Sequence, residues 1–571
     1  MDEIEVVQDI NGVEQFDMLK GTKMKKNKQH LTKPLVYTIK EKPPFCLSLM
    51  LAIQNVVTTI AGALIVINIL APKLCILPED PAQAYLLSTT ILMAGTSTLI
   101  QTILGIRLPI TQNSGFVYMI CSLYILDMPK WQCSNEGDLY SMGPEARTLE
   151  WQLRIRDLQG TIIIISIIQM LLGYSGIIGK LMNYIGPLTI VPTMCIVALT
   201  VVEKGVHLIS GNWTTSLVTL FFLTLFSQYL RDITISIPIL SKVEGLVYKK
   251  LKIFSLFSVL FSVGIMWIAC IYMTSKNELS PTDPANTESK YGVFYNAQLF
   301  RIPYPFQWGL PLFNYKSIIA MLPALFASIV ESIGTYNTCA RFANTSLPPS
   351  SAISRGIGVQ GVNSILAGLT GMGTGVSASS ENVGHNGISQ VCSRIIIQYA
   401  AMILILIAPF TRLIAFLITL PDPVLGALMS VLLAMVAAVG LSNLQFINLN
   451  SMRNLYILGI SMFFGLFTNC IFQALPKYIV LHDHLVLSKY DFLNQPLLVF
   501  MSSGMFIGGI IGFILDNTIP DDSMSKFKTN TYFINEDEKR YNDISNLENE
   551  KMYDISEKLI ERINNVLTFF V

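Results

Sequence analysis

Long apolar stretches follow one another from residue 45 to residue 518, and they constrain this chain more than any other feature of its sequence. A helix needs about 20 predominantly apolar residues to cross the hydrocarbon core of a bilayer. By this criterion we predict about fourteen spanning segments, at 46–70, 84–104, 110–126, 161–180, 187–206, 213–230, 254–274, 318–340, 356–372, 376–392, 395–418, 424–440, 454–476 and 496–516. The chain is therefore predicted to be an all-α polytopic membrane protein.

Charged residues are few and lie mainly at the two ends. They make up 13% of the chain, against 52% hydrophobic residues. We divide the chain into a polar amino-terminal tail at 1–44, a transmembrane transporter domain at 45–518 and a carboxy-terminal tail at 519–571. The net charge of +1 gives no reason to expect a nucleic-acid partner. The nine cysteines show no metal-binding spacing, so we interpret them as small buried side chains and expect no metal and no cofactor.

Basic residues in the loops predict an orientation. When the lysine-rich amino terminus is placed in the cytoplasm, Arg107, Lys180 and Arg341 also fall on the cytoplasmic side, as the positive-inside rule requires. The loops at 133–150 and 275–316 then lie outside, and so does the glycosylation sequon at Asn212. Both termini are expected in the cytoplasm of a protein in the plasma membrane.

A short internal echo suggests a repeat. Gln112-Asn-Ser-Gly opens the third apolar segment, and Glu381-Asn-Val-Gly opens the tenth. A four-residue match can arise by chance, but here each copy opens the third segment of a set of seven. Because seven is odd, the two halves would be inverted in the membrane. Inverted repeats with broken helices at matching positions are typical of secondary transporters, which bind substrate between the repeats.

Glu331 lies near the middle of the eighth apolar segment. A carboxylate at that depth costs several kcal/mol unless it is paired, hydrated or protonated. It could be a structural group bonded to a neighbouring helix, but acids inside the membrane are functional by default, and we favour a functional role. Thr335 follows one turn later on the same helix face.

Glu381 opens the tenth segment, where a half-helix would present free backbone N–H groups and a positive dipole end that favour an anion. It could instead serve only as a helix cap. Its neighbours Ser380 and Asn382 could cap equally well, so capping alone does not require Glu381. With the repeat in mind, we favour a functional role here too.

These patterns define two candidate sets. Phe116 could stack on a planar ligand or simply pack, and His385 could titrate near neutrality although buried histidines are more often structural. The predicted substrate-binding residues are Glu331, Glu381, Phe116, Ser380, Asn382, Gln112, Ser114 and Gln54. The predicted ion-coupling residues are Glu331, Glu381, Thr335 and His385.

Catalysis and channel function find little support in the sequence. It shows no nucleophile–base pair, phosphate loop or metal cluster, so we predict that the chain is not an enzyme. It also lacks the charge rings or repeated pore loop of a channel.

Several sequence blocks resemble the nucleobase–ascorbate transporter family, above all its animal branch, which includes the sodium-dependent vitamin C transporters. The blocks span much of residues 45–518: GIRLP (105–109), NYIGPLT (183–189), FSQYLR (226–231), RIPYPFQWGLP (301–311), ESIG (331–334), LPDPVLG (420–426), AVGLSNLQF (438–446) and FILDNT (513–518).

The resemblance implies fourteen spans as a seven-plus-seven inverted repeat, with short strands opening spans three and ten. It implies a core domain of spans 1–4 and 8–11, and a gate domain of spans 5–7 and 12–14 that forms a homodimer and supports elevator-like transport. The family's substrate-binding carboxylate matches Glu331, its span-three aromatic matches Phe116, and its signature motif matches the four residues that begin at Glu381.

The chain also departs from the family pattern. The signature ends in Ser389-Gln390 rather than Thr followed by Arg, Lys or Gly. Many relatives have an ionisable residue in place of Thr335, and animal relatives often have His in place of Asn55. Ion coupling is therefore less securely implied than binding; sodium is expected, with a proton as the alternative.

The choice of substrate depends on Glu381. The vitamin C transporters have Pro at this motif position, and nucleobase transporters have Gln or Glu. Ascorbate is an anion, and a second carboxylate about 5 Å away would cost about 3 kcal/mol at an effective dielectric constant near 20. We therefore favour uptake of a neutral nucleobase, of the uracil or purine type, and keep ascorbate as the alternative.

Overall fold

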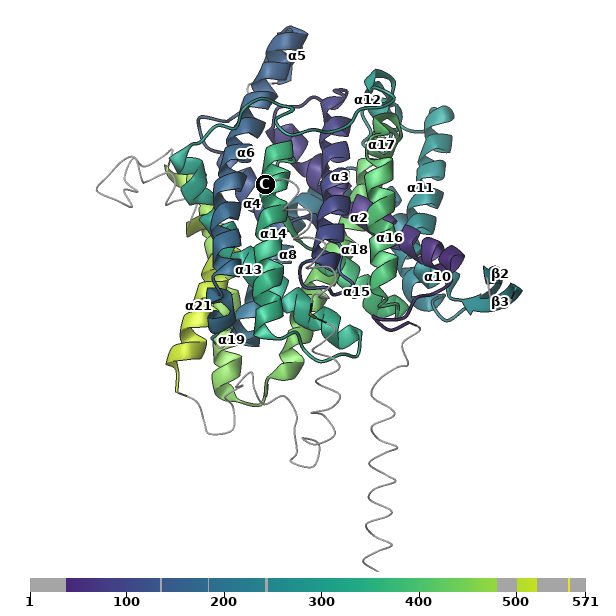
Figure 1. Ribbon diagram of the computed structural model, residues 1–571. Coiled ribbons are helices and arrows are strands. Elements are labelled where there is room, and N and C mark those ends of the chain that lie inside the picture. Colours follow the sequence, from purple (N-terminus) through teal and green to yellow (C-terminus); the bar gives the residue numbers. More distant parts are fainter. Residues whose placement is uncertain are drawn as a thin grey trace, which may run out of the picture.

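A computed structural model describes residues 37–133, 136–182, 184–241, 245–479, 501–520 and 553–554. Most of the longer helices run side by side in one bundle (Figure 1). The helices are α2 Phe45–Lys73, α3 Ala82–Ile103, α4 Phe116–Leu126, α5 Glu136–Ser141, α6 Pro144–Tyr174, α7 Ile177–Leu181, α8 Pro187–Ser210, α9 Trp213–Thr224, α10 Ile253–Leu256, α11 Ser258–Ser275, α12 Tyr291–Asn296, α13 Tyr315–Phe342, α14 Ser350–Thr370, α15 Ser380–Ser389, α16 Arg394–Ile407, α17 Thr411–Ile418, α18 Asp422–Leu441, α19 Met452–Ile479 and α21 Gly504–Thr518.

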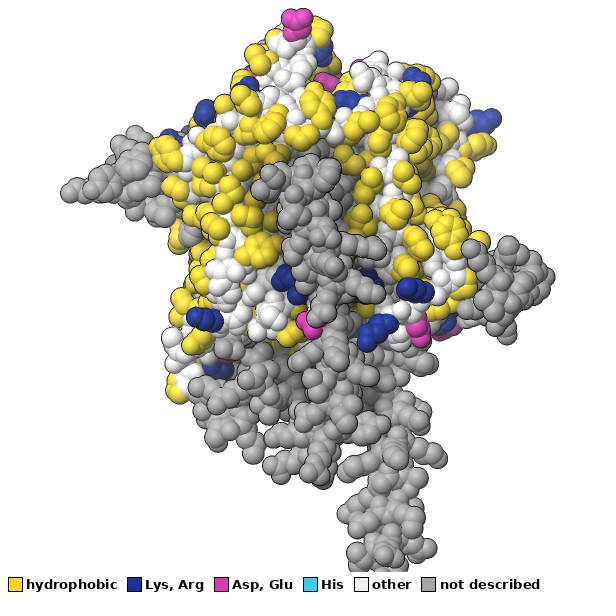
Figure 2. Space-filling model, in the orientation of Figure 1, with side chains coloured by type: hydrophobic (Ala, Val, Ile, Leu, Met, Phe, Trp, Pro, Cys, Tyr) yellow, Lys and Arg dark blue, Asp and Glu magenta, His cyan; other side chains and the backbone are white. Residues whose placement is uncertain are grey.

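The length and hydropathy of the helices fit a membrane. Within the described residues, seven helices are long and apolar enough to cross a bilayer, and the bent pair α16–α17 would make an eighth. Three more apolar helices are shorter: Phe116–Leu126, Met452–Thr468 and Gly504–Thr518. Hydrophobic side chains cover much of the visible described surface between its two ends (Figure 2). The fold is thus a mostly helical polytopic membrane fold, and the count of fourteen spans stays a prediction.

Two three-residue strands meet inside the bundle. β1, Gln112–Ser114, pairs antiparallel with β4, Val376–Ala378, so that Asn113 lies opposite Ser377. Helix α4 begins two residues after β1, and α15 begins two residues after β4. All six strand residues are buried. The strand pair therefore brings the starts of two half-helices together within the protein, where backbone polar groups can find partners.

Glycines allow some helices to pack at very short range. A Cβ atom at Gly173 of α6 would lie 2.2 Å from the Gly358 nitrogen of α14, and one at Gly361 would lie 2.5 Å from the Met170 nitrogen. Small residues at helix interfaces let backbones approach closely in membrane proteins. Helices α6 and α14 therefore pack with their backbones in close contact.

The structure corrects two predicted segments and adds a hairpin. The fourth segment, predicted at 161–180, belongs to helix α6, which runs from Pro144 to Tyr174. The first part of this helix was missed because its charged residues lower the hydropathy on which the prediction was based. The eleventh segment, predicted as one run at 395–418, is bent by 100° between α16 and α17, at a break that contains Pro409. The loop before α10 contains a hairpin of β2, Ile235–Ser241, and β3, Gly245–Leu251.

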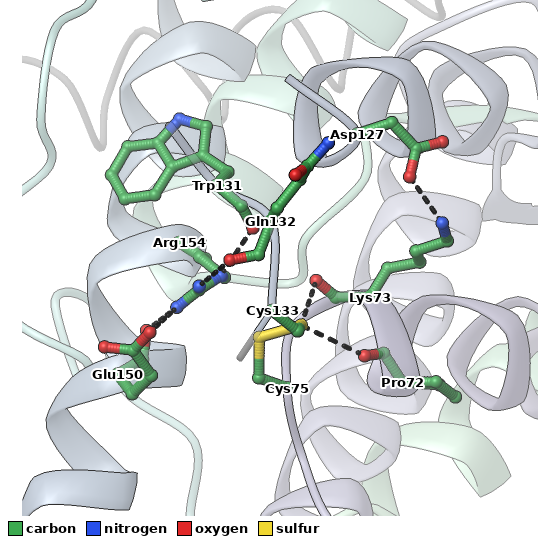
Figure 3. The surroundings of a disulfide bond; sticks show 9 residues. All are labelled: Pro72, Lys73, Cys75, Asp127, Trp131, Gln132, Cys133, Glu150 and Arg154. Atoms are coloured by element: carbon green, nitrogen blue, oxygen red, sulfur yellow. Dashed lines mark hydrogen bonds and ion pairs between the residues drawn. A yellow bond between two sulfur atoms is a disulfide. The ribbon is translucent and has the colours of Figure 1, made fainter. Parts of the chain in front are cut away.

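A disulfide joins Cys75, just after α2, to Cys133, after α4 (Figure 3). Nearby, Lys73 pairs with Asp127, and the Arg154 guanidinium of α6 donates from Nε to the Trp131 carbonyl oxygen at 3.0 Å. The interpretation of all cysteines as isolated buried side chains is therefore wrong for Cys75 and Cys133, which form this disulfide, and for Cys46 and Cys470, which are exposed. It holds for Cys121, Cys195 and Cys270, which are free and buried.

Candidate functional site

Glu331 and Glu381 lie near each other in the interior. Glu331, on α13, is 3% exposed, and Glu381, in the first turn of α15, is 4% exposed. The two carboxylates repel each other electrostatically. The Oε2 atom of Glu331 is buried and has no hydrogen-bond partner among the described residues. Buried polar atoms are almost always bonded, so this oxygen points to a ligand, ion or water.

Thr335 links α13 to the start of α15. Its hydroxyl donates to the Glu331 carbonyl oxygen at 2.8 Å and lies 2.8 Å from the Ser380 hydroxyl oxygen. Ser377, from β4, interacts through its side chain with the Glu331 carboxylate. The structure thus brings Glu331, Thr335, Ser380 and Glu381 into one polar cluster, which we call the carboxylate cluster.

Helix α2 forms the other side of Glu381. The side chain of Asn113 interacts with Glu381, and its amide nitrogen donates to the Thr59 carbonyl oxygen at 3.0 Å. Gly62 faces both side chains, since a Cβ atom there would lie 3.2 Å from Glu381 Oε1 and 2.7 Å from Asn113 Nδ2. Because Gly62 has no side chain, the side chains of Glu381 and Asn113 have space to contact each other beside α2.

The remaining predicted residues from spans three and ten lie close by in the fold. The Asn382 amide nitrogen donates to the Thr59 hydroxyl at 2.9 Å and also to the Thr111 hydroxyl. Phe116 opens α4 and is 3% exposed. Both side-chain polar atoms of Gln112 and the Ser114 hydroxyl are buried without a partner among the described residues. Asn382 thus braces the fold through its amide nitrogen, whereas its Oδ1 atom, Gln112 and Ser114 keep unused hydrogen-bonding capacity.

Gln54 and His385 lie together at a second place. They line a small cavity with Thr58 of α2 and with Leu256 and Phe257 of the α10–α11 region. Gln54 Nε2 and His385 Nε2 are buried and unbonded within the described part of the chain. No hydrogen bond between described residues joins either of them to Glu331 or Glu381. The structure therefore groups these two predicted residues around this cavity, and His385 follows Glu381 by one turn of α15.

Sequence reasoning missed Thr59, Gly62 and Ser377 as parts of this site, and it treated Asn113 only as a mirror of Asn382. A signal was available for α2. Asn55, Thr59 and Gly62 are spaced four and three residues apart, so they form a polar and small stripe along one helix face. Ser377 lies in the Ser-Ala-Ser-Ser run before Glu381, but the direction of its side chain depends on how β4 pairs with β1.

Comparison with known proteins identifies this chain's family. Residues 47–473 match a family model described as the Permease family, which represents the nucleobase–ascorbate transporters. The chain belongs to the nucleobase–ascorbate transporter family. It is therefore a multi-pass membrane transporter and not an enzyme.

Similar members of the nucleobase–ascorbate transporter family occur in animals and plants. The chain is 39% identical over 495 residues to human solute carrier family 23 member 2, covering 85% of this chain and 75% of the relative. It is 37% identical over 495 residues to mouse solute carrier family 23 member 1, covering 85% and 80%. It is 33% identical over 490 residues to Arabidopsis thaliana nucleobase-ascorbate transporter 7, covering 85% and 86%.

A solved structure of SLC26A9 has a similar fold, with a TM-score of 0.50 at 14% identity. The match covers 81% of this chain and 69% of that one. At this level of identity the comparison concerns the fold alone.

Gly62→Ala is expected to weaken uptake about tenfold or more. Its methyl group would lie 2.7 Å from Asn113 Nδ2 and 3.2 Å from Glu381 Oε1, so at least one of these side chains must move. Concentration-dependent uptake measures the change, with Gly264→Ala as the control, because a Cβ atom at Gly264 of α11 meets nothing within 4 Å. Equal uptake by both variants would contradict a role of Gly62 in shaping the site.

Proposed function

We propose that this transporter imports neutral nucleobases, of the uracil or purine type, by ion-coupled secondary active transport. The proximity of two buried carboxylates, Glu331 and Glu381, carries the proposal. A neutral purine or pyrimidine offers several ring N–H donors, which two carboxylates can accept. Phe116, at the start of α4, would offer its ring as a stacking surface for the flat base.

The same two carboxylates disfavour an anionic substrate. Ascorbate held by Glu331 would face a second negative charge at Glu381, at the cost of about 3 kcal/mol for a separation of about 5 Å. The positive ends of the half-helices α4 and α15 offset part of that repulsion. A neutral base needs no such compensation, and this difference supports the nucleobase over the anion.

Ascorbate is the second candidate, and the overall similarity favours it. Identity to the human solute carrier family 23 member is 39%, against 33% for the plant nucleobase-ascorbate transporter. The sequence blocks resemble the animal vitamin C branch most closely. The residue at a single motif position, Glu381, thus favours a nucleobase, whereas the similarity of the whole chain favours ascorbate.

For the mechanism, we infer the family's fourteen-span inverted repeat. Core spans 1–4 and 8–11 would carry substrate past gate spans 5–7 and 12–14 in an elevator-like motion, with a homodimer formed through the gate. The paired strands before α4 and α15 support this inference, since they occupy matching positions in the two halves. The SLC26A9 likeness supports the fold in which such motion would occur.

The disulfide supports the proposed orientation in the plasma membrane. Disulfides persist in oxidising compartments and are rare in the cytosol. The end of the bundle that contains Cys75 and Cys133 would therefore face outward. The opposite ends of α2 and α3, and both chain termini, would face the cytoplasm.

Uptake of labelled solutes tests the substrate. We would express the protein in cells that lack carriers for these solutes and measure uptake of uracil, xanthine, hypoxanthine and ascorbate. Saturable uptake of at least one nucleobase, with poor competition by excess ascorbate, is the expected result. Counterflow in proteoliposomes then distinguishes a carrier from a channel, because a carrier exchanges labelled for unlabelled solute.

Uptake is expected to depend on sodium. The Thr335 hydroxyl cannot titrate, but together with the Ser380 hydroxyl it supplies neutral oxygen atoms 2.8 Å apart beside Glu331. Hard cations such as sodium prefer oxygen ligands. Replacing sodium by choline should therefore reduce uptake about tenfold or more. Uptake that is unchanged in choline and collapses with a protonophore would instead favour proton coupling through Glu331, Glu381 or His385.

A further inference from the structure

A short piece of the carboxy-terminal tail is buried in the body of the protein. Tyr553 is 1% exposed and belongs to the main hydrophobic core. Its hydroxyl donates to the carbonyl oxygen of Ser346, in the connection between α13 and α14, at 2.9 Å. The ring of Tyr553 is thus buried and its hydroxyl is hydrogen-bonded, as is usual for a tyrosine inside a protein rather than on its surface.

The backbone of the same segment is held as well. Arg355, in the first turns of α14, donates from Nη2 to the Tyr553 carbonyl oxygen at 2.5 Å and from Nε to the Gly105 carbonyl oxygen at 3.0 Å. A single guanidinium therefore ties the tail to the end of α3. The fork of donors on arginine suits such a bridge between two backbone segments.

Asp554 adds charge complementarity. Its carboxylate attracts the guanidinium groups of Arg107 and Arg355. Arg394 also belongs to this basic cluster, because its Nη1 donates to the Arg107 carbonyl oxygen at 3.4 Å. None of these three arginines forms a salt bridge of 4 Å or less with a carboxylate in the described ranges. Two atoms of Arg107, Nε and Nη1, are buried and lack a partner there.

The docking site and the root of the tail lie on different parts of the molecule. The tail follows α21, which packs against α8, α19 and, through Phe506 and Phe326, the middle of α13. Tyr553 binds instead at the connection between α13 and α14, beside the end of α3. Residues 519–552 thus link α21 in the sequence to the segment that docks at the connection between α13 and α14. In the proposed mechanism α21 belongs to the gate, and α3, α13 and α14 belong to the core.

We propose that Tyr553–Asp554 is an intramolecular latch, which docks at Ser346, Arg355 and Arg107 and restrains the core against the gate. The docking part stands on the contacts alone, and the restraint rests on the elevator mechanism proposed above. Undocking would release the cytoplasmic end of α13 and α14, so a chain without the latch should transport faster.

Cysteine accessibility in the full-length protein tests the docking. The exposed free cysteines Cys46 and Cys470 are replaced by Ser, and Ser346→Cys is added as the reporter. The Ser346 hydroxyl is buried and makes no hydrogen bond with a described residue, so this change keeps the backbone acceptor of Tyr553. A maleimide is then applied to permeabilised cells, and the same protein without the Ser346→Cys change gives the background.

Tyr553→Ala is expected to raise the labelling rate of the reporter thiol at least tenfold. Asp554→Ala should raise it less, since the ring stays anchored. The matched control is Tyr541→Ala, which changes the same residue type elsewhere in the tail and should leave the rate unchanged. An equal rate in Tyr553→Ala and its parent, or an equal increase in Tyr541→Ala, would overturn the docking.

Uptake of labelled uracil, xanthine, hypoxanthine and ascorbate tests the restraint in the same variants. Tyr553→Ala is expected to raise the uptake rate at least twofold at unchanged surface expression. Faster labelling with unchanged uptake would overturn the restraint. If the parent carried none of the three nucleobases, the proposed substrate would fail, and the labelling result would still decide whether the tail docks.

Discussion

Glu331→Gln is expected to abolish uptake or reduce it sharply while surface expression stays intact. Glutamine keeps the size and shape of the side chain, so the packing of α13 is preserved. It replaces a charged acceptor by a neutral amide, and loss of a charge-assisted hydrogen bond to the ligand costs about 1.5–3 kcal/mol. That cost corresponds to a roughly ten- to hundredfold loss of affinity. Uptake kinetics and surface biotinylation measure the two effects separately.

The control for this experiment is Glu145→Gln, which removes the charge of an exposed carboxylate in the first turn of α6. Its uptake should equal that of the unmodified protein. Normal transport by Glu331→Gln would remove Glu331 from the binding site and leave it as a structural carboxylate.

The sequence predicted the helices well where each is a continuous apolar run. The predicted segments at 46–70 and 84–104 correspond to α2, Phe45–Lys73, and α3, Ala82–Ile103. Errors arose where charge or a proline interrupts the run. The first part of α6 contains Arg154 and Asp157, both buried, and hydropathy cannot show that such residues are paired inside the protein.

The prediction of the candidate site started from its charged members, and Thr335 and Ser380 were included because they lie beside Glu331 and Glu381 in the sequence. Glu331 and Glu381 are conspicuous because a carboxylate inside an apolar segment is costly. Their partners are threonine, serine, asparagine and glycine, which are common in membrane helices and carry no such signal. Ser377 meets Glu331 because β4 pairs with β1 in one register, and a shift by one residue would turn its side chain to the other face.

Long-range pairings could not be found from one sequence. The disulfide joins cysteines 58 residues apart, and Tyr553 binds a loop 207 residues before it. Neither contact leaves a local pattern in the chain. The echo at Gln112 and Glu381 marks the two regions but not equivalent positions, because Gln112 opens β1 whereas Glu381 is the second residue of α15, after β4. What repeats in the structure is a strand followed by a half-helix, with Val376 rather than Glu381 in the place of Gln112.

Glu381→Pro is expected to reduce nucleobase uptake steeply and to permit weak ascorbate uptake. Glu381 is the second residue of α15, and proline is tolerated in the first turn of a helix, where N–H groups lack intrahelical partners. The change deletes one of the two acceptors proposed for a ring N–H of the base. It also removes the repulsion of about 3 kcal/mol that disfavours an anion. Labelled nucleobase and ascorbate are measured side by side in the variant and the unmodified protein.

Glu381→Gln serves as the matched variant, because it removes the charge but keeps the backbone N–H at the start of α15. If the charge of Glu381 alone excludes ascorbate, both variants should transport ascorbate. The gain of ascorbate uptake should be smaller than the loss of nucleobase uptake, because the shape of the pocket must also fit the new solute. Saturable ascorbate uptake by the unmodified protein, with no transport of any nucleobase, would contradict the proposal. It would mean that the half-helix dipoles at α4 and α15 outweigh the negative charge of Glu381, and that the similarity to the animal relatives extends to their substrate.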